Sequence, residues 1–219
     1  MLSRLALVLI VVLSAAPHVV HADSPVAIVE EVSAGIRDVA LFDFFAAGHV
    51  IDLGSEGRLV LGYLSGCVRE EIIGGRVIVG AKRSAVDGGK VQRQTVECDG
   101  GGLQLTSAQS GKSGVQVVRA DPAGGAAGEP KPKLTLYGAS PIVLAAGATG
   151  SAVFQRLDRA APKIVVSFAK GAADLAKDGR KLARGGIYRA SAGDQSKVFR
   201  VDRYARPGFE PLLSRLVLF

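Results

Sequence analysis

His49 is the single histidine beyond residue 22, and two carboxylates, Asp43 and Asp52, lie close to it in the sequence. Such a group could supply an acid and a base for hydrolysis. A nucleophilic serine would also have to lie within reach of the imidazole. The chain has no Gly-x-Ser-x-Gly sequence, the turn that presents such a serine in α/β-hydrolases. We therefore assign no catalytic residue, and a secreted hydrolase that uses His49 with Asp43 or Asp52 is the second hypothesis.

Two other polar motifs predict surface features. Glu70 and Glu71 are adjacent, so in a strand they face opposite sides and cannot work as an acid and base pair. We expect both to be solvated. Residues 106–113, TSAQSGKS, end like a phosphate-binding loop, but Thr106 stands where that loop needs a glycine. A polar turn is expected there, and the sequence predicts no cofactor.

The first 22 residues predict a cleavable secretory signal peptide. Arg4 supplies the positive charge, residues 5–13 form an apolar run, and Ala22 offers a small residue for cleavage. The apolar run is far shorter than the roughly 20 residues of a membrane-spanning helix, and no later run reaches that length. We expect a chain that is exported to the periplasm or beyond, begins at Asp23 and keeps no transmembrane anchor after cleavage.

Cys67 and Cys98 are the only two cysteines. In an exported chain, two thiols without a competitor predict one intramolecular disulfide, which would stabilise the fold by roughly 3–4 kcal/mol in the chain-entropy model. A zinc site is the alternative, but it needs closely spaced cysteine pairs and further ligands, which one histidine does not provide. The sequence therefore predicts a Cys67–Cys98 disulfide and no metal site.

The net charge of +7 predicts a cationic surface. Such a surface attracts anionic lipid headgroups, acidic glycans or nucleic acid. Basic residues occur singly along the chain, and only 5% of the residues are aromatic. Binding to single-stranded nucleic acid relies on aromatic side chains that stack on bases, so we expect no nucleic-acid partner.

The elements that must position these residues are predicted to be strands. Between residues 39 and 118, short apolar runs alternate with glycine-bearing turns, which favours a β-meander or sandwich. Residues 50–53 and 58–63 flank such a turn and predict a hairpin. Residues 25–45 alone have helix-like apolar spacing, which Ser33 and Gly35 weaken.

A segment rich in proline and glycine, residues 121–133, predicts a linker between two small domains. The N-terminal β-rich domain would span residues 23–120. The C-terminal domain, residues 134–219, offers about seven short candidate strands, the number expected of a small sandwich. Residues 212–219 are predicted to be its closing strand.

Several glycine-bearing and apolar segments carry a family resemblance: Gly48–Gly54, Leu59–Tyr63, Cys67, the pairs Glu70-Glu71, Gly74-Gly75 and Cys98-Asp99, and later Gly185–Tyr188 and Phe199–Asp202. On these residues, the stretch 50–99 resembles the envelope β-domains of bacterial FecR-type proteins and of secreted proteins built like them, and residues 182–202 are similar to the immunoglobulin-like domain that often follows. The resemblance implies no catalytic residue. The favoured hypothesis is an all-β, non-enzymatic binding or scaffold protein, with a sensory role as one form of it, that presents sheet edges or loop ends to another envelope protein or surface component.

Overall fold

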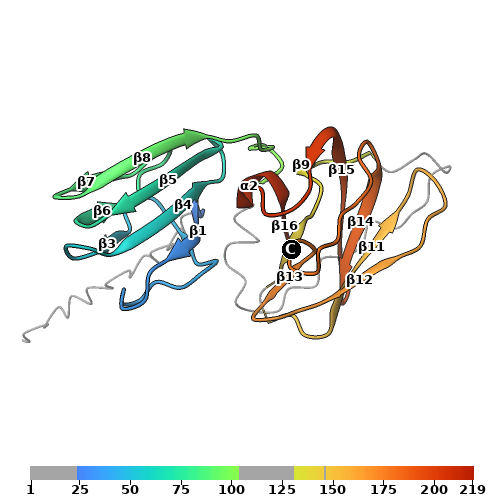
Figure 1. The fold of residues 1–219 in the computed structure, drawn as a ribbon, viewed down its shortest axis with the longest axis horizontal. Helices are drawn as coiled ribbons and strands as arrows, with labels where there is room; N and C mark the ends of the chain where they lie inside the picture. Colours follow the sequence, from blue (N-terminus) through green and yellow to red (C-terminus); the bar gives the residue numbers. More distant parts are fainter. Residues whose placement is uncertain (1–23, 104–130, 146) are drawn as a thin grey trace, which may run out of the picture.

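The structure, a computed structural model, describes residues 24–103, 131–145 and 147–219. The expected signal peptide, the motif at 106–113 and the linker as far as residue 130 lie outside the described residues. Strands account for nearly all regular structure in the described ranges, with one short helix, so the predicted all-β class is confirmed. Figure 1 shows two halves joined side by side.

The N-terminal half, residues 24–103, contains two antiparallel sheets with orders β2-β1-β4-β5-β8 and β3-β6-β7. A core of buried aliphatic side chains, with Phe45 and Tyr63, lies between them. Burial alternates along β3, β5 and β6, because each of these strands turns one face to the core. The strands are β1 (Ala27–Val32), β2 (Phe44–Phe45), β3 (Val50–Asp52), β4 (Arg58–Tyr63), β5 (Val68–Ile73), β6 (Arg76–Ile78), β7 (Ala85–Asp87) and β8 (Lys90–Thr95).

Two expectations for this half were wrong. β3 does not pair with β4 as a hairpin but with β6 in the smaller sheet. β4 is buried on both faces, and it lies between β1 and β5 in the larger sheet. The glycine turn between β3 and β4 therefore carries the chain from one sheet to the other. Helix-like spacing in residues 25–45 was also misleading, because strand β1 occupies Ala27–Val32.

The C-terminal half, residues 131–219, is a sandwich of a five-stranded sheet, β12-β11-β14-β15-β9, and a three-stranded sheet, β13-β10-β16. Two pairs are parallel, β15 with β9 and β10 with β16. Phe154, Tyr188 and Phe199 are in the core of this half. The strands are β9 (Thr135–Gly138), β10 (Ile142–Leu144), β11 (Ser151–Arg156), β12 (Ile164–Ser167), β13 (Ala172–Asp174), β14 (Ile187–Ala192), β15 (Gln195–Arg206) and β16 (Leu216–Leu218).

The predicted closing strand at 212–219 was only partly right. Its first four residues form the short helix α2 (Leu212–Arg215), and only Leu216–Leu218 form strand β16. All four residues of α2 are buried. The helix α2 therefore packs between the two halves and does not extend the strand β16.

The core of the sandwich extends into the N-terminal half. Ile28, Leu64, Val96 and Leu103 from the N-terminal half belong to the same buried cluster as the interior of the sandwich. α2 contacts both β9 and β4. Because the cluster is continuous across the junction, we refer to halves, and the predicted boundary between two domains stays a prediction. No helix in the described ranges is long and apolar enough to cross a membrane.

Candidate functional site

The residues of the hydrolase hypothesis are engaged in separate local contacts. The exposed ring of His49 stacks on Phe45, with 4.2 Å between ring centroids. Asp43 Oδ2 accepts a hydrogen bond of 2.6 Å from the Ala40 amide. Asp52 Oδ1 accepts one of 2.9 Å from the Gly54 amide. Within the described ranges, no hydrogen bond joins His49 to either carboxylate, so the structure does not assemble the acid and base group.

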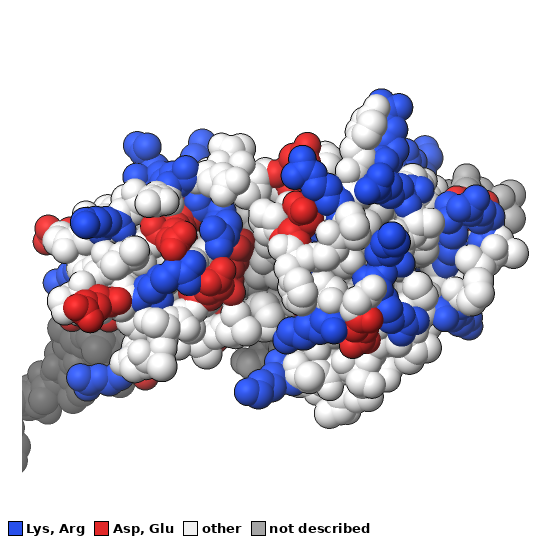
Figure 2. All heavy atoms as spheres, viewed as in Figure 1, with Lys and Arg blue, Asp and Glu red and all other residues white. Residues whose placement is uncertain are grey.

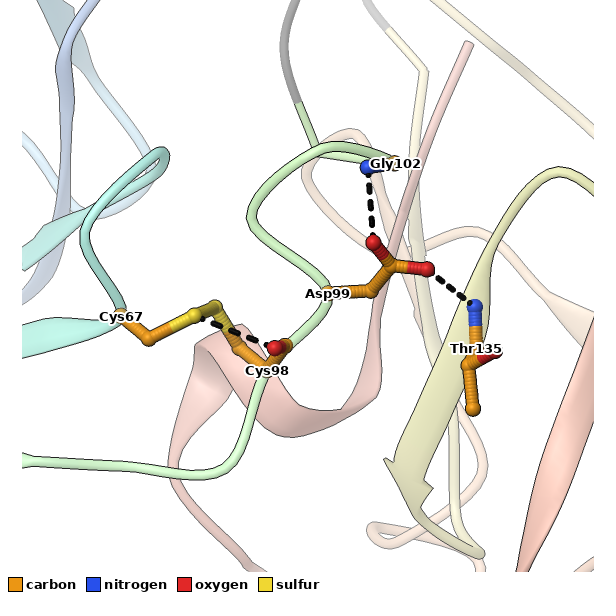
Figure 3. The surroundings of a disulfide bond; sticks show 5 residues. All are labelled: Cys67, Cys98, Asp99, Gly102 and Thr135. Carbon is orange, nitrogen blue, oxygen red and sulfur yellow. Dashed lines mark hydrogen bonds between the residues drawn. A yellow bond between two sulfur atoms is a disulfide. The ribbon is translucent and has the colours of Figure 1, made fainter.

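Cys67 and Cys98 form the predicted disulfide (Figure 3), with 5.5 Å between their Cα atoms. The disulfide joins the residue directly before β5 to the segment that follows β8. The dashed line from Cys67 Sγ to the Cys98 carbonyl is a contact of 3.1 Å, but an oxidised sulfur carries no proton to donate. A disulfide indicates an oxidising compartment.

Asp99, directly after the disulfide, connects the two halves. Its Oδ1 accepts a hydrogen bond of 3.0 Å from the Gly102 amide, and its Oδ2 accepts one of 2.8 Å from the amide of Thr135 at the start of β9 (Figure 3). A carboxylate that accepts two backbone hydrogen bonds is held firmly. The disulfide fixes the segment that carries Asp99 to the N-terminal sheet, and Asp99 joins that segment to the sandwich.

A groove of about 340 Å³ lies where the halves meet. Leu41 from the β1–β2 loop and Phe209 from the β15–α2 loop line it and are 47% and 72% exposed. Large apolar side chains with this much exposure are few in the described chain. We call this feature the junction groove, and the charged residues that line it are Glu30, Glu31, Arg69, Asp174, Lys177, Glu210 and Arg215.

A ladder of alternating charges crosses β1, β4 and β5 on the outer face of the N-terminal sheet. Arg69 bonds to Glu30 at 2.9 Å and to Glu31 at 3.0 Å. Arg58 bonds to Glu31 at 2.6 Å and to Glu71 at 2.7 Å. Each arginine thus bridges two carboxylates, and Arg58, with Arg69, holds the pKa of Glu31 below its usual value. Two arginines share three carboxylates, so most of the charge on this side of the groove is compensated.

Glu30 is the least ordinary member of the ladder. It is the extra residue of a β-bulge, since Val29 pairs with Leu61 and Glu31 with Val60. Its side chain is only 5% exposed. Its Oε1 accepts no hydrogen bond from any described residue. Burial raises the pKa of Glu30, with the hydrogen bond from Arg69 opposing that effect.

Gly62 makes the position of Glu30 possible. A Cβ atom at Gly62 would lie 2.5 Å from Glu30 Oε1 and 3.0 Å from Leu213 Cγ. Both distances are shorter than ordinary van der Waals contacts, so a larger residue would displace the carboxylate or the helix α2. The glycine in the apolar run of β4 therefore allows the C-terminal half to dock.

Arg215 and Asp174 form a buried ion pair on the other side of the groove. Arg215 Nη1 and Nη2 donate to Asp174 at 2.6 and 3.2 Å, and the two side chains are 7% and 5% exposed. Arg215 also donates to the carbonyls of Ser140 and Glu210. The guanidinium lies 5.8 Å from the centroid of the Phe209 ring. These contacts hold the groove wall that carries Phe209.

The expectation that Glu70 is solvated was wrong. Glu70 is fully buried, its two carboxylate oxygens share the hydrogen bond that the Ser84 amide donates, and Arg93 Nε donates to its Oε1 at 2.7 Å. It faces inward from β5, whereas its neighbour Glu71 faces outward to Arg58. The adjacent carboxylates do lie on opposite faces, as the strand geometry requires. Arg93, the cross-strand partner of Glu70 on β8, supplies the charge that allows its burial.

The two halves differ in charge. Residues 24–103 contain eight Lys and Arg against eleven Asp and Glu, whereas residues 131–219 contain sixteen against six. In Figure 2, red and blue atoms alternate over the N-terminal half, and blue predominates over the C-terminal half. The predicted cationic surface therefore belongs to the sandwich. Among the described residues, no group of three or more His, Cys, Asp or Glu is arranged to hold a metal ion.

The sequence reasoning did not find the junction groove, because its lining comes from segments up to 185 residues apart, as with Glu30 and Arg215. The available signal was Gly62 in an otherwise apolar run, which marks a close approach of another segment. Comparisons with protein-family models, with curated proteins and with solved structures gave no match for this chain.

Proposed function

We propose that this chain is an exported, non-enzymatic binding protein of the bacterial envelope that recognises a segment of another envelope protein in the junction groove. The observation that carries the proposal is the pair of exposed apolar side chains, Leu41 and Phe209, which line one groove from opposite halves. Exposed aromatic and aliphatic side chains next to polar groups are typical of protein recognition sites. An extended segment with apolar side chains would contact both.

The state of the charged groups favours binding over catalysis. Arg69 and Arg215 in the groove are each held by carboxylates, and each is bonded to at least two acceptors. Fixed ion pairs provide hydrogen bonds and orientation at the rim of a recognition site. Acid–base catalysis requires instead a group within reach of the proton that it transfers, and His49 with its stacking partner Phe45 does not line this groove.

Export supports the same proposal. The disulfide requires an oxidising compartment, and the periplasm or the cell exterior provides one. We expect the mature protein to begin at Asp23. Fractionation of cells, followed by mass measurement of the intact protein, tests both points, and a cytoplasmic protein that retains residues 1–22 would contradict them.

Crosslinking in intact cells tests the groove. A tagged L41S/F209S variant should recover the partner much less than the unchanged protein does. The matched control is V165S/Y204S, because Val165 is 51% and Tyr204 73% exposed and both lie outside the groove. The control should recover the partner normally. Equal recovery by both variants, or equal loss, would show that the groove is not the binding site.

A further inference from the structure

A second cavity, of about 430 Å³, lies beside β8, the outermost described strand of the larger N-terminal sheet. Its lining comprises Val68, Lys82, Arg83, Arg93, Gln94 and Thr95. Three of these six residues are cationic and none is acidic. We call this cavity the edge pocket. The charges of Lys82 and Arg83 form no ion pair with any described residue.

Two hydrogen-bond acceptors on the inner side of the edge pocket fix the guanidinium of Arg93. Its Nε donates to the buried Glu70 at 2.7 Å, and its Nη2 donates to the Ser84 carbonyl at 2.8 Å. Ser84 is fixed in turn by a hydrogen bond of 2.8 Å between its hydroxyl and that of Tyr63. Burial raises the pKa of Tyr63 to about 12, so this contact persists throughout the physiological range. Within the described chain, Nη1 of Arg93 donates to no protein atom, which leaves its two protons for a ligand.

The edge of β8 adds backbone donors to the pocket. Among the residues that the structure describes, β8 is the last strand of its sheet and pairs only with β5. The Val96 amide donates toward β5, to the Cys67 carbonyl. Because N–H groups alternate in direction along a strand, the amides of Arg93 and Thr95 point away from β5, toward the open edge. Three cationic side chains, a hydroxyl and two amides therefore surround this side of the pocket.

We propose that the edge pocket binds the phosphate group of an anionic ligand. Arginine and lysine next to backbone amides and a hydroxyl form the usual recognition set for phosphate oxygens. Glu70 neutralises Arg93 from the interior, so the charges of Lys82 and Arg83 remain to attract the anion. The volume lies within the range of small-molecule sites, so the pocket has room for an organic group attached to the phosphate. This site is separate from the junction groove, and the proposal is independent of the function assigned to that groove.

Amide NMR titration of the oxidised protein with inorganic phosphate and with glycerol phosphate tests the proposal. Chloride at matched ionic strength separates binding from screening. We expect saturating shifts at the amides of Val68, Gln94 and Thr95. The K82A/R83A variant should lose affinity about tenfold, as expected for the loss of charge-assisted hydrogen bonds.

The matched control is R76A/K90A, which removes the same charge from two exposed residues outside the pocket. Its affinity for phosphate should change by less than about twofold, because salt screens exposed charges that lie outside the site. Both variants change exposed side chains only, so their melting temperatures should match that of the unchanged protein. This measurement checks that the fold is intact. Equal loss in the two variants, or shifts spread over the basic C-terminal half, would overturn the proposal.

Vesicles identify the source of the phosphate. If the ligand is a lipid headgroup, vesicles of phosphatidylglycerol should bind the protein in a manner that depends on Lys82 and Arg83, and vesicles of phosphatidylcholine should bind more weakly. If the ligand is a soluble phosphate ester, glycerol phosphate should bind and the vesicles should not. Failure of inorganic phosphate, glycerol phosphate and both vesicles to bind would overturn the site without affecting the groove.

Discussion

The junction groove and the edge pocket share the five-stranded N-terminal sheet but treat charge in different ways. In the groove, Arg69 and Arg215 are matched by Glu30, Glu31 and Asp174. In the edge pocket, cations line the cavity and the one compensating carboxylate, Glu70, lies buried behind it. Gln94 on β8 lines both cavities, so the two sites are neighbours.

The difference indicates two kinds of selectivity. Two of the three cations in the groove, Arg69 and Arg215, are already paired, so a charged ligand would have to break existing ion pairs to reach them. The affinity of the groove then depends on apolar contact and shape, as Leu41 and Phe209 suggest. A site with unpaired cations selects by charge. The same sheet therefore offers a recognition surface on one side and an anion site on the other.

The largest expected effect comes from the buried pair in the groove. R215M should cost about 3–5 kcal/mol of unfolding free energy, because it leaves Asp174 charged and buried without a partner. R93M in the edge pocket should cost less, about 1–3 kcal/mol, because the Arg93 side chain is 37% exposed, so that loss of its guanidinium opens the buried Glu70 to water, and Glu70 keeps the hydrogen bond from the Ser84 amide. Denaturant unfolding of both variants measures the difference.

A second substitution checks the reason for the first effect. R215M/D174N should regain part of the lost stability, because it removes the uncompensated charge. If R93M destabilises the protein as much as R215M, or if the double variant regains nothing, the contrast between the closed and the open ion pair is wrong.

The disulfide supports both sites, since Val68 of the edge pocket follows Cys67 and Asp99 follows Cys98. C67S/C98S should lower the unfolding free energy by about 3–4 kcal/mol, the chain-entropy value for a loop of this length. Thermal and denaturant unfolding of the oxidised protein and of the variant provide the measurement. The melting temperature of the unchanged protein should also fall under reducing conditions, whereas that of the variant should not respond. An unchanged melting temperature in C67S/C98S would contradict the structural role.

G62A probes the approach of the two halves. The added Cβ would crowd Glu30 Oε1 and Leu213, so we expect a loss of about 1–3 kcal/mol and exposure of the junction in hydrogen exchange. G66A is the matched control, because its nearest neighbour would be Val68 Cγ2 at 3.8 Å, an ordinary contact. The control should be neutral within about 0.5 kcal/mol. Equal stability of the two variants would mean that Gly62 is not required for docking.

The smallest effect is a pair of pH dependences with opposite signs. Burial raises the pKa of Glu30, so the unchanged protein loses stability as pH rises from the ordinary value of 4.5 through the raised pKa. E30Q removes this loss, so its melting temperature relative to the unchanged protein should increase between about pH 4 and pH 8.

Glu31 should show the reverse. Hydrogen bonding to Arg58 lowers its pKa, so its ionised form adds stability that is present above 4.5 and is lost as pH falls through the lowered pKa. The melting temperature of E31Q relative to the unchanged protein should therefore decrease as pH rises. Parallel curves for E30Q and E31Q would show that burial does not govern Glu30.

Local patterns in the sequence predicted most strands. Burial alternates along β14, because a strand with one buried face must alternate, whereas β8 is exposed apart from the half-buried Val91. Pairing was harder to predict. The turn at residues 54–57 is consistent with a hairpin, yet β4 is apolar along its length and needs a neighbour on each side, which β1 and β5 provide.

The candidate sites were harder still. Glu70 looked like a surface residue because its partner Arg93 is 23 residues away and meets it only through the register of β5 and β8. The groove depends on Glu30 and Asp174, which are far apart in the sequence. No local pattern reports such contacts, since the free energy of a buried charge depends on what the fold places beside it.

The sequence by itself determined the strand content, the pairing of the two cysteines and the excess of positive charge. These are properties of composition and short-range periodicity, and alternating apolar residues or a single pair of thiols leave few alternatives. Tertiary structure alone decided which strands are neighbours, which carboxylates are buried, and that the core of the sandwich extends into the N-terminal half. Those outcomes depend on long-range packing, in which residues such as Gly62 and Leu213 meet only after the whole chain has folded.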